Sequence, residues 1–378
     1  MIISAACRVA SQLKSDELCD HGARKRGTLR SPHEVIARSE LFSVSELTKT
    51  CEIDWDSVLY GTMADIVQPF VTSTSQSTNS VLMIRPSRFY PNPETAADNA
   101  FQARADYASN ALTAEARSEF DAAVQTLRDA GVRVHVFEDT AEPEKPDAVF
   151  PNNWISTHHD GRIALFPMYS ALRRRERRHD IIGELRQHYR VTEVIDYSGF
   201  EEEGCCLEGT GSLVLDHVNR IAYVSLSNRS NPKVIRRFAD DFGYEPVTFT
   251  SIGTDGQTIY HTNVMMCIGT NIALTGLGMI RDKAEQQKVR ERLQASGKEI
   301  VELEPQQVAN FAGNAIELHD ARSDKLLVVS ARAMPTFTEG QRAVLRRHVR
   351  FIPLELPTIE LGGGSARCMI ATIHLPLL

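Results

Sequence analysis

The sequence predicts an α/β fold in which five similar units close into a ring. A theme of strand, helix and strand repeats from residue 80 onward, in units of about fifty residues. The last apolar run of the chain is left over and can pair with the first unit, which describes a closed, pseudo-symmetric α/β propeller. The alternative is an open, doubly wound sheet. Such a sheet would carry a glycine-rich turn after its first strand, and residues 85–90 contain no glycine.

The units are expected in the following order. Unit one begins with a buried strand over residues 80–85, followed by an amphipathic helix from Thr113 that ends at Gly131 and a strand over 132–137. Each later unit begins with two apolar runs, at 148–154 and 163–166, 207–215 and 221–226, 261–268 and 271–274, and 314–318 and 326–330. Helices follow over 173–189, 232–242, 282–296 and 339–349, then strands over 192–195, 246–249, 299–303 and 351–356. The strand that completes unit one is expected over 368–374.

Composition and charge exclude several classes of function. The chain has 378 residues, of which 42% are hydrophobic and 24% charged, enough for a large core and too polar for a membrane protein. A net charge of −7 disfavours nucleic acid as a partner. The 7 cysteines are irregularly spaced, which suggests reduced thiols in a cytoplasm-like compartment. We therefore expect a cytoplasmic protein that acts on a small molecule, and self-association into a homo-oligomer is compatible with the sequence.

Residues 1–75 differ in character from the rest. They are rich in Ser, Thr and mixed charges with weak periodicity, which predicts a poorly ordered extension ahead of a single domain over residues 76–378. The first fifteen residues carry Arg8 and Lys14 without an acid and are compatible with an organellar transit peptide. Because acids follow from Asp16, the cytoplasmic location is preferred.

Polar residues stand at the leading ends of equivalent apolar runs, so a closed ring would bring them to one end of its axis. They are Asn152, Asn153, Glu208, His261, Asn263 and Cys368. Each has a structural explanation when taken alone, as a turn residue, a solvated strand end or a satisfied core residue. Together they supply the thiol, imidazole and carboxylate that thiol catalysis requires. An ordinary cysteine has a pKa of ~8.5, so Cys368 needs a partner, and we expect His261 in that role.

This set, in this order, resembles the guanidine-modifying superfamily of arginine deiminases, dimethylarginine hydrolases and amidinotransferases. The resemblance runs from about residue 81 to the C-terminus. Its most specific features are Phe-Pro-Asn-Asn at 150–153, Pro-Met-Tyr at 167–169 with Arg-Arg-Arg-Glu at 173–176, Leu-Glu-Gly at 207–209, His-Thr-Asn at 261–263 and Arg-Cys-Met at 367–369. It implies the five-unit α/β propeller known as the pentein fold, in agreement with the repeat.

The resemblance also implies roles for individual residues. Cys368 resembles the nucleophile that attacks the central carbon of a guanidine-like group, and His261 the general acid and base. Glu208 resembles the carboxylate that binds the substrate head group and orients His261. Arg173 and Arg229 resemble arginines that bind the substrate α-carboxylate, for which two guanidinium forks are suited. Because the thiol supplies the nucleophile, neither a metal nor another cofactor is expected.

Departures from the family pattern point to the substrate. The deiminases place two aspartates at the head-group site, where this sequence has Asn153 and Asn263. A guanidinium is a cation with donors only, whereas a ureido group is neutral and has both donors and a carbonyl acceptor, as asparagine amides do. The exchange favours citrulline over arginine. Asp147 stands where it could hold the α-ammonium group.

The chain therefore looks like a citrulline ureidase, a hydrolase that converts L-citrulline to ornithine, ammonia and carbon dioxide. Cys368 would form an S-carbamoyl intermediate, and water activated by His261 would resolve it. Two alternatives stay open. An arginine-type deiminase or an amidinotransferase would be expected to keep the aspartates. A non-catalytic ring-fold binding protein would not need Cys, His and Glu together.

Overall fold

The computed structural model describes residues 74–102 and 109–378. The chain divides into Met1–Phe70 and Val71–Leu378, and the fold is that of the second unit. The extension predicted over residues 1–75, with its candidate transit segment, lies outside the described residues except at its C-terminal end. Within the described ranges, no helix has the length and apolar character needed to cross a bilayer.

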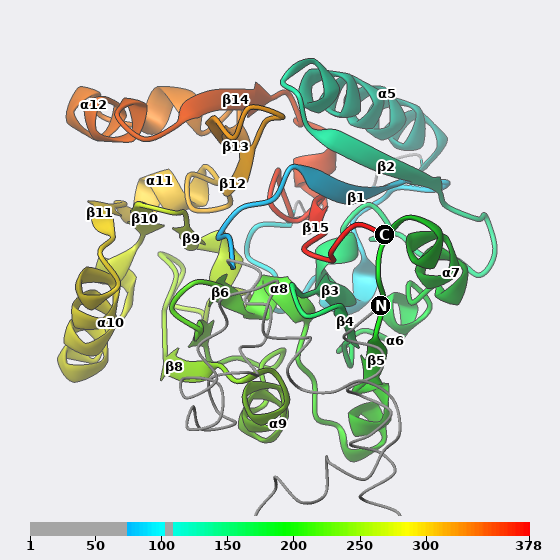
Figure 1. The fold of residues 1–378 in the computed structure, drawn as a ribbon, viewed down its shortest axis with the longest axis horizontal. Coiled ribbons are helices and arrows are strands. Elements are labelled where there is room, and N and C mark those ends of the chain that lie inside the picture. Colours follow the sequence, from blue (N-terminus) through cyan, green and yellow to red (C-terminus); the bar gives the residue numbers. More distant parts are fainter. Residues whose placement is uncertain (1–73, 103–108) are drawn as a thin grey trace, which may run out of the picture. The chain divides into compact units, whose positions relative to one another are not determined.

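Five three-stranded sheets form the framework of residues 74–378 (Figure 1). In every sheet the middle strand pairs antiparallel with one neighbour and parallel with the other. A helical segment connects each parallel pair, because parallel strands need a crossover connection. The pseudo-symmetric α/β propeller predicted from the repeat is confirmed.

The first sheet joins segments from both ends of the domain. β1 (Ser80–Arg85) pairs in parallel with β2 (Arg133–Glu138), and α5 (Ser109–Asp129) connects the two. The other neighbour of β1 is β15 (Ala371–Thr372), which returns from the end of the chain and runs antiparallel to it. The C-terminal strand therefore completes unit one, as the sequence predicts.

The other four units repeat this order of elements. Unit two contains β3 (Ile155–Thr157), β4 (Arg162–Leu165), α6 (Ala171–Arg174), α7 (His179–His188) and β5 (Glu193–Asp196); unit three contains α8 (Gly209–Ser212), β6 (Val214–Asp216), β7 (Ile221–Ser225), α9 (Pro232–Phe242) and β8 (Glu245–Phe249). Unit four contains β9 (Met266–Ile268), β10 (Ile272–Thr275), α10 (Lys283–Ala295) and β11 (Glu299–Glu302); unit five contains α11 (Pro305–Ala309), β12 (Ile316–His319), β13 (Lys325–Ser330), α12 (Glu339–Arg346) and β14 (Arg350–Leu354).

Local sequence signals set the ends of the outer helices. Before α9, the Asn231 side chain accepts a hydrogen bond from the second helical N–H, Pro232 holds the first helical position, and Gly243 follows the last turn. Before α10, the Asp282 carboxylate accepts hydrogen bonds from two backbone N–H groups of the first turn. Because these caps are readable in the sequence, the predicted bounds of both helices agree with the structure to within about one residue at each end.

The single helix expected over 173–189 is instead two helices, α6 and α7, separated at residues 175–178. The break directs charged side chains to separate partners. Arg173 turns inward to Glu176, and Arg177 forms an ion pair with Glu201. A continuous helix would have kept the arginines of this run as mutually repelling neighbours.

The first strands of the units are shorter than predicted, and this difference places the functional residues. Their expected leading halves are short helical turns, η2 (Pro151–Asn153), α8 and η4 (Thr262–Val264), or plain turns before β12 and β15. Proline, glycine and asparagine favour such turns over extended backbone. The prediction that Cys368 begins the final strand is therefore wrong, since Cys368 lies in a turn and β15 begins at Ala371.

Candidate active site

Turns from different units converge where their first strands begin. Two glycines show how closely their backbones approach. A Cβ atom on Gly211 would lie 2.2 Å from the side-chain amide of Asn153, and one on Gly313 would lie 2.5 Å from the carbonyl oxygen of Val264. Both distances are too short for a side chain to be accommodated without movement. Residues that are remote in sequence are thus held against each other by backbone packing.

A small cavity lies among these turns. It has a volume of about 20 Å³, and its lining includes Asp147, Asn153, Arg173, Arg229, His261 and Cys368. The other two predicted site residues contact members of this lining, because Glu208 bonds to His261 and Asn263 to Cys368. The structure thus brings all of the predicted residues together. Since a single water needs ~10–15 Å³ of such space, the cavity as it stands is too small for an amino acid.

His261 and Glu208 form a buried pair. The Nε2 atom of His261 lies 2.7 Å from Oε2 of Glu208, and the N–H of Tyr169 donates to Oε1 at 2.9 Å. Burial lowers the pKa of His261 to about 4, although Glu208 acts in the opposite direction. The imidazole is therefore neutral near pH 7. With the carboxylate accepting at Nε2, the lone pair is on Nδ1, where it can take up a proton.

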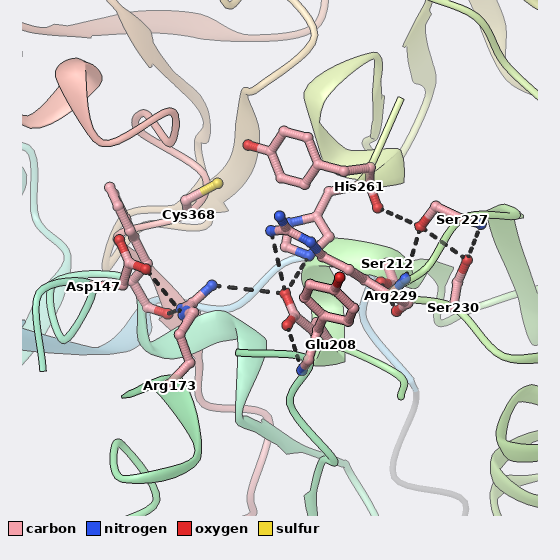
Figure 2. A network of polar contacts seen from close by, with 12 residues as sticks. Asp147, Arg173, Glu208, Ser212, Ser227, Arg229, Ser230, His261 and Cys368 are labelled. Atoms are coloured by element: carbon pink, nitrogen blue, oxygen red, sulfur yellow. Dashed lines mark hydrogen bonds and ion pairs between the residues drawn. The ribbon is translucent and has the colours of Figure 1, made fainter. Parts of the chain in front are cut away.

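Glu208 lies between two guanidinium groups as well as beside His261 (Figure 2). Its Oε2 atom is 3.7 Å from the NH1 atom of Arg173 and 3.8 Å from that of Arg229. Burial alone would raise the pKa of Glu208, but the arginines and the hydrogen bond from His261 outweigh it and bring the pKa well below its usual range. The protein itself therefore keeps this carboxylate ionised and compensates its charge.

Two asparagine amides face the thiol of Cys368. The Nδ2 atom of Asn314 lies 3.3 Å from Sγ, and that of Asn263 lies 3.6 Å away. Sequence reasoning missed Asn314. Its signal was its position, since it precedes the first strand of unit five as Asn153 and Asn263 precede those of units two and four.

Arg173 is largely satisfied by protein groups. Its Nε and NH2 atoms lie 2.9 and 3.0 Å from the two oxygens of Glu176, and NH2 also donates to the carbonyl oxygen of Phe150 at 3.3 Å. With the amide of Asn153 turned so that its oxygen faces the guanidinium, that oxygen accepts from NH1 and NH2 at 3.0 Å each. Asp147 lies 3.5 Å from Nε. Arg173 thus organises the cavity wall.

Arg229 keeps more of its hydrogen-bonding capacity. Its NH2 atom lies 2.6 Å from the carboxylate of Asp98, while its buried Nε has no hydrogen-bond partner among the described residues. The guanidinium lies over the ring of Tyr260, 4.6 Å from its centroid, which fixes its plane. Of the two predicted carboxylate-binding arginines, Arg229 is therefore the one with donors to spare.

The described residues contain no cluster of three or more His, Cys, Asp or Glu side chains arranged to hold a metal ion. The adjacent cysteines Cys205 and Cys206 are free thiols. The chemistry that the site can perform with its own groups is nucleophilic attack by the thiol, with proton transfer through His261.

Comparisons with known proteins agree with this geometry. The model of the family described as N,N dimethylarginine dimethylhydrolase, eukaryotic, matches residues 85–375. No curated protein matches. Among solved structures, the substrate-bound N-terminal domain of ArgZ, an arginine dihydrolase from the Ornithine-Ammonia Cycle in Cyanobacteria, is 17% identical, with a TM-score of 0.62 over 79% of this chain and 99% of that chain.

Two further structures share the fold at lower identity. Unliganded AgrE is 15% identical with a TM-score of 0.60, covering 79% of this chain and 40% of that one. A dimethylarginine dimethylaminohydrolase in its adduct with S-methyl-L-thiocitrulline is 15% identical with a TM-score of 0.53, covering 78% and 98%. Because the family model spans most of the domain, the chain belongs to the N,N-dimethylarginine dimethylhydrolase family, within the guanidine-modifying superfamily that its motifs resemble.

Proposed function

We propose that this protein is a cysteine-dependent hydrolase that acts on the ureido group of L-citrulline and yields ornithine, ammonia and carbon dioxide. Family membership supports the coarser part, a hydrolase of guanidino-type C–N bonds. One observation carries the citrulline assignment. The cavity's carboxylates are already paired with the protein's own arginines, whereas the side chains that bond to the thiol are neutral amides.

The charge of the head-group site favours a neutral substrate. Glu208 faces two guanidiniums and His261, and Asp147 pairs with Arg173. A substrate guanidinium would need an uncommitted carboxylate, because an unpaired buried charge costs several kcal/mol. A ureido group needs only donors for its oxygen and acceptors for its N–H groups. Asn153 and Asn263 can supply both.

The first half of the reaction is acyl transfer to sulfur. Cys368 attacks the ureido carbon while its proton passes to Nδ1 of His261, and Glu208 stabilises the imidazolium that forms. The C–S bond forms as the carbonyl electrons move to oxygen, where amide N–H groups such as that of Asn263 can stabilise the negative charge. The intermediate then expels the ornithine amine, which takes the proton from His261, and leaves an S-carbamoyl group on Cys368.

The second half is hydrolysis. Nδ1 of His261 takes a proton from water as the water oxygen attacks the S-carbamoyl carbon. The C–S bond breaks, and the departing thiolate takes the proton back from His261, which restores the starting state. The carbamate product decomposes to ammonia and carbon dioxide.

At the other end of the substrate, Arg229 binds the α-carboxylate in exchange for Asp98, and Asp147 binds the α-ammonium group. Arg173 supports the wall between them.

The test is to incubate the purified protein separately with L-citrulline, L-arginine and N,N-dimethylarginine, and to quantify ornithine, citrulline and ammonia. We expect ornithine and ammonia from citrulline and no product from the other two. Cys368→Ala should abolish turnover, while Cys206→Ala, a buried thiol that does not line the cavity, should retain it. Turnover by Cys368→Ala at the wild-type rate would contradict the nucleophile assignment.

The second candidate is hydrolysis of a guanidino substrate on the same nucleophile. The family description and the arginine dihydrolase among the structural neighbours favour it. In that case Glu208 and Asp147 would have to exchange their arginine partners for the substrate cation. Citrulline formed from arginine or from dimethylarginine in the assay above would establish this candidate and refute the citrulline assignment.

A further inference from the structure

We propose that Asn314 is a further catalytic residue, whose side-chain amide donates a hydrogen bond to the thiolate form of Cys368. The Nδ2–Sγ distance is 3.3 Å, shorter than the 3.6 Å from Asn263. Asn314 is completely buried, so solvent does not compete with the sulfur for its side-chain amide. The proposal rests on the proposed function only in taking Cys368 as the nucleophile, and it holds for a ureido or a guanidino substrate alike.

The orientation of the Asn314 amide is fixed by its neighbours. Its Oδ1 atom accepts the backbone N–H of Arg367 at 3.1 Å, the residue immediately before the nucleophile. A backbone N–H can only donate, so the oxygen must face it and the NH₂ group must face the other way. Its Nδ2 atom lies 3.1 Å from the carbonyl oxygen of Asn263, 3.4 Å from the side-chain oxygen of Asn263 and 3.3 Å from the sulfur, so its N–H bonds point toward Asn263 and Cys368. The donor is therefore positioned before any substrate binds.

A buried thiol without such donors stays protonated. Burial raises the pKa of Cys206 to about 11 and that of Cys267 to about 12. Cys368 is just as buried, yet among the described residues it alone combines this burial with two amide donors at its sulfur. Hydrogen bonds to a charged acceptor are stronger than those to a neutral one, so these donors favour the thiolate over the thiol.

Few charged or titratable groups around the sulfur share this role with the amides. Burial keeps His261 neutral, so no imidazolium faces Cys368 in the resting protein. Tyr260 stays protonated, because burial raises its pKa and the nearby Cys368 raises it further. Among cations, the guanidiniums of Arg173 and Arg229 line the same cavity but are turned to carboxylates. The buried Arg367 guanidinium donates to the carbonyl oxygen of Ile370, and its electrostatic interaction with Cys368 also favours the thiolate.

The experiment measures the reactivity of the thiol in the absence of substrate. The rate of Cys368 alkylation by iodoacetamide is followed from pH 5 to 10, with mass spectrometry to locate the adduct. Asn314→Asp keeps the acceptor for the Arg367 N–H but removes the donor. We expect the alkylation rate at neutral pH to fall roughly 10- to 100-fold, with the midpoint moved to higher pH. Asn310→Ala, on the same segment but bonded away from the thiol, is the control and should match the wild type.

Turnover should follow the same pattern. In Asn314→Asp, kcat should fall at neutral pH and recover as pH rises, while KM changes little. If this variant does not fold, Asn314→Ser serves instead, because its shorter side chain cannot reach the sulfur. An unchanged alkylation midpoint in a folded variant would overturn the proposal. Because alkylation needs no substrate, a failure of the citrulline assignment leaves this result interpretable.

Discussion

The residues around Cys368 and His261 form two groups with different electrostatic roles. Glu208 orients His261, and burial together with the guanidiniums of Arg173 and Arg229 keeps the imidazole neutral. The amides of Asn263 and Asn314 face the sulfur. A substrate placed between the two groups meets imidazole on one side and thiol on the other. On the proposed function, the head group would contact neutral polar atoms, which favours an uncharged head group.

Asn263→Asp tests that rule. A carboxylate beside the sulfur would remove an amide donor, place a negative charge next to the thiolate and create an uncommitted partner for a cation. We expect citrulline turnover to fall, and the ratio of kcat/KM for citrulline over arginine to drop by roughly 10-fold or more. The measurement is that ratio, with Asn310→Asp as a remote control. A ratio that does not move would mean that this position does not set specificity.

At the residue scale, the sequence predicted the thiol, imidazole, carboxylate and two asparagines as site residues, because each belongs to a short motif that can be recognised locally. It did not identify Asn314, Asp98 or Glu176 as contacts of the site. Their partners lie far along the chain or are set by side-chain orientation. A pairing such as Asn314 with Cys368, 54 residues apart, is visible only once the turns are packed together.

At the scale of elements, the site is built from the short turns that precede the first strands, and these turns tolerate little change. α8 touches both η2 and η4, and its glycines lie against Asn152, Asn153 and His261. The outer helices were predictable from caps and periodicity. The turns were not, because the apolar residues that flank them resemble a longer strand when the sequence is read alone.

Gly211→Ala tests whether close packing of α8 positions the site. The added Cβ would lie 2.2 Å from the Asn153 amide and 2.8 Å from Nδ1 of His261, so one or both must move. We expect kcat to fall at least about 10-fold, since small displacements of catalytic groups are costly. Gly183→Ala in α7 is the matched control. Its Cβ would meet nothing within 4 Å, and the helix should be stabilised by about 0.5–1 kcal/mol with activity unchanged.

The two variants must be compared by both activity and thermal unfolding. Loss of activity in Gly211→Ala with a thermal midpoint close to that of the wild type would assign the effect to the site. Full activity in Gly211→Ala would show that the turns can shift without consequence, and the packing explanation would then fail.

At the scale of the domain, the ring is closed by hydrogen bonds between its first and last segments. The N–H of Ile373 donates to the carbonyl oxygen of Ser80 at 2.9 Å, and the Thr78 hydroxyl donates to the carbonyl oxygen of Ile373 at 2.7 Å. The sequence predicted this closure from the odd strand left at the C-terminus. It did not predict what fills the space between units, because side chains from three different units meet there.

That space holds a cluster of four histidines, His158, His159, His217 and His374. The rings of His217 and His374 lie 4.2 Å apart between centroids, and Nδ1 of His374 lies 3.1 Å from Nε2 of His159. His158 and His217 are buried, although each directly follows a strand at a turn. Burial, with repulsion between neighbouring imidazoles, lowers the pKa of His158, His217 and His374 well below the usual value.

The cluster predicts that the domain loses stability in mild acid. The unfolded chain protonates these histidines near pH ~6.5, whereas the folded domain keeps them neutral to lower pH. Below that pH the unfolded state binds more protons, so the free energy of unfolding decreases as pH falls and rises again as pH increases toward 7. His158→Phe should weaken this dependence. The His158 ring already packs against the tilted Phe242 ring, with centroids 4.0 Å apart, and its Nδ1 atom has no hydrogen-bond partner among the described residues.

Thermal unfolding of the full chain between pH 5 and 8 measures this effect. We expect the midpoint of the wild type to fall as pH drops below about 6.5, with a smaller fall in His158→Phe. His188→Phe, at a histidine whose side chain is 52% exposed, should reproduce the wild-type slope. Equal slopes in all three proteins would show that acid destabilisation arises elsewhere, for example from the buried His261, whose lowered pKa acts in the same direction. A His261→Gln variant would then carry the reduced slope instead, which distinguishes the pH response of the cluster from that of the catalytic pair.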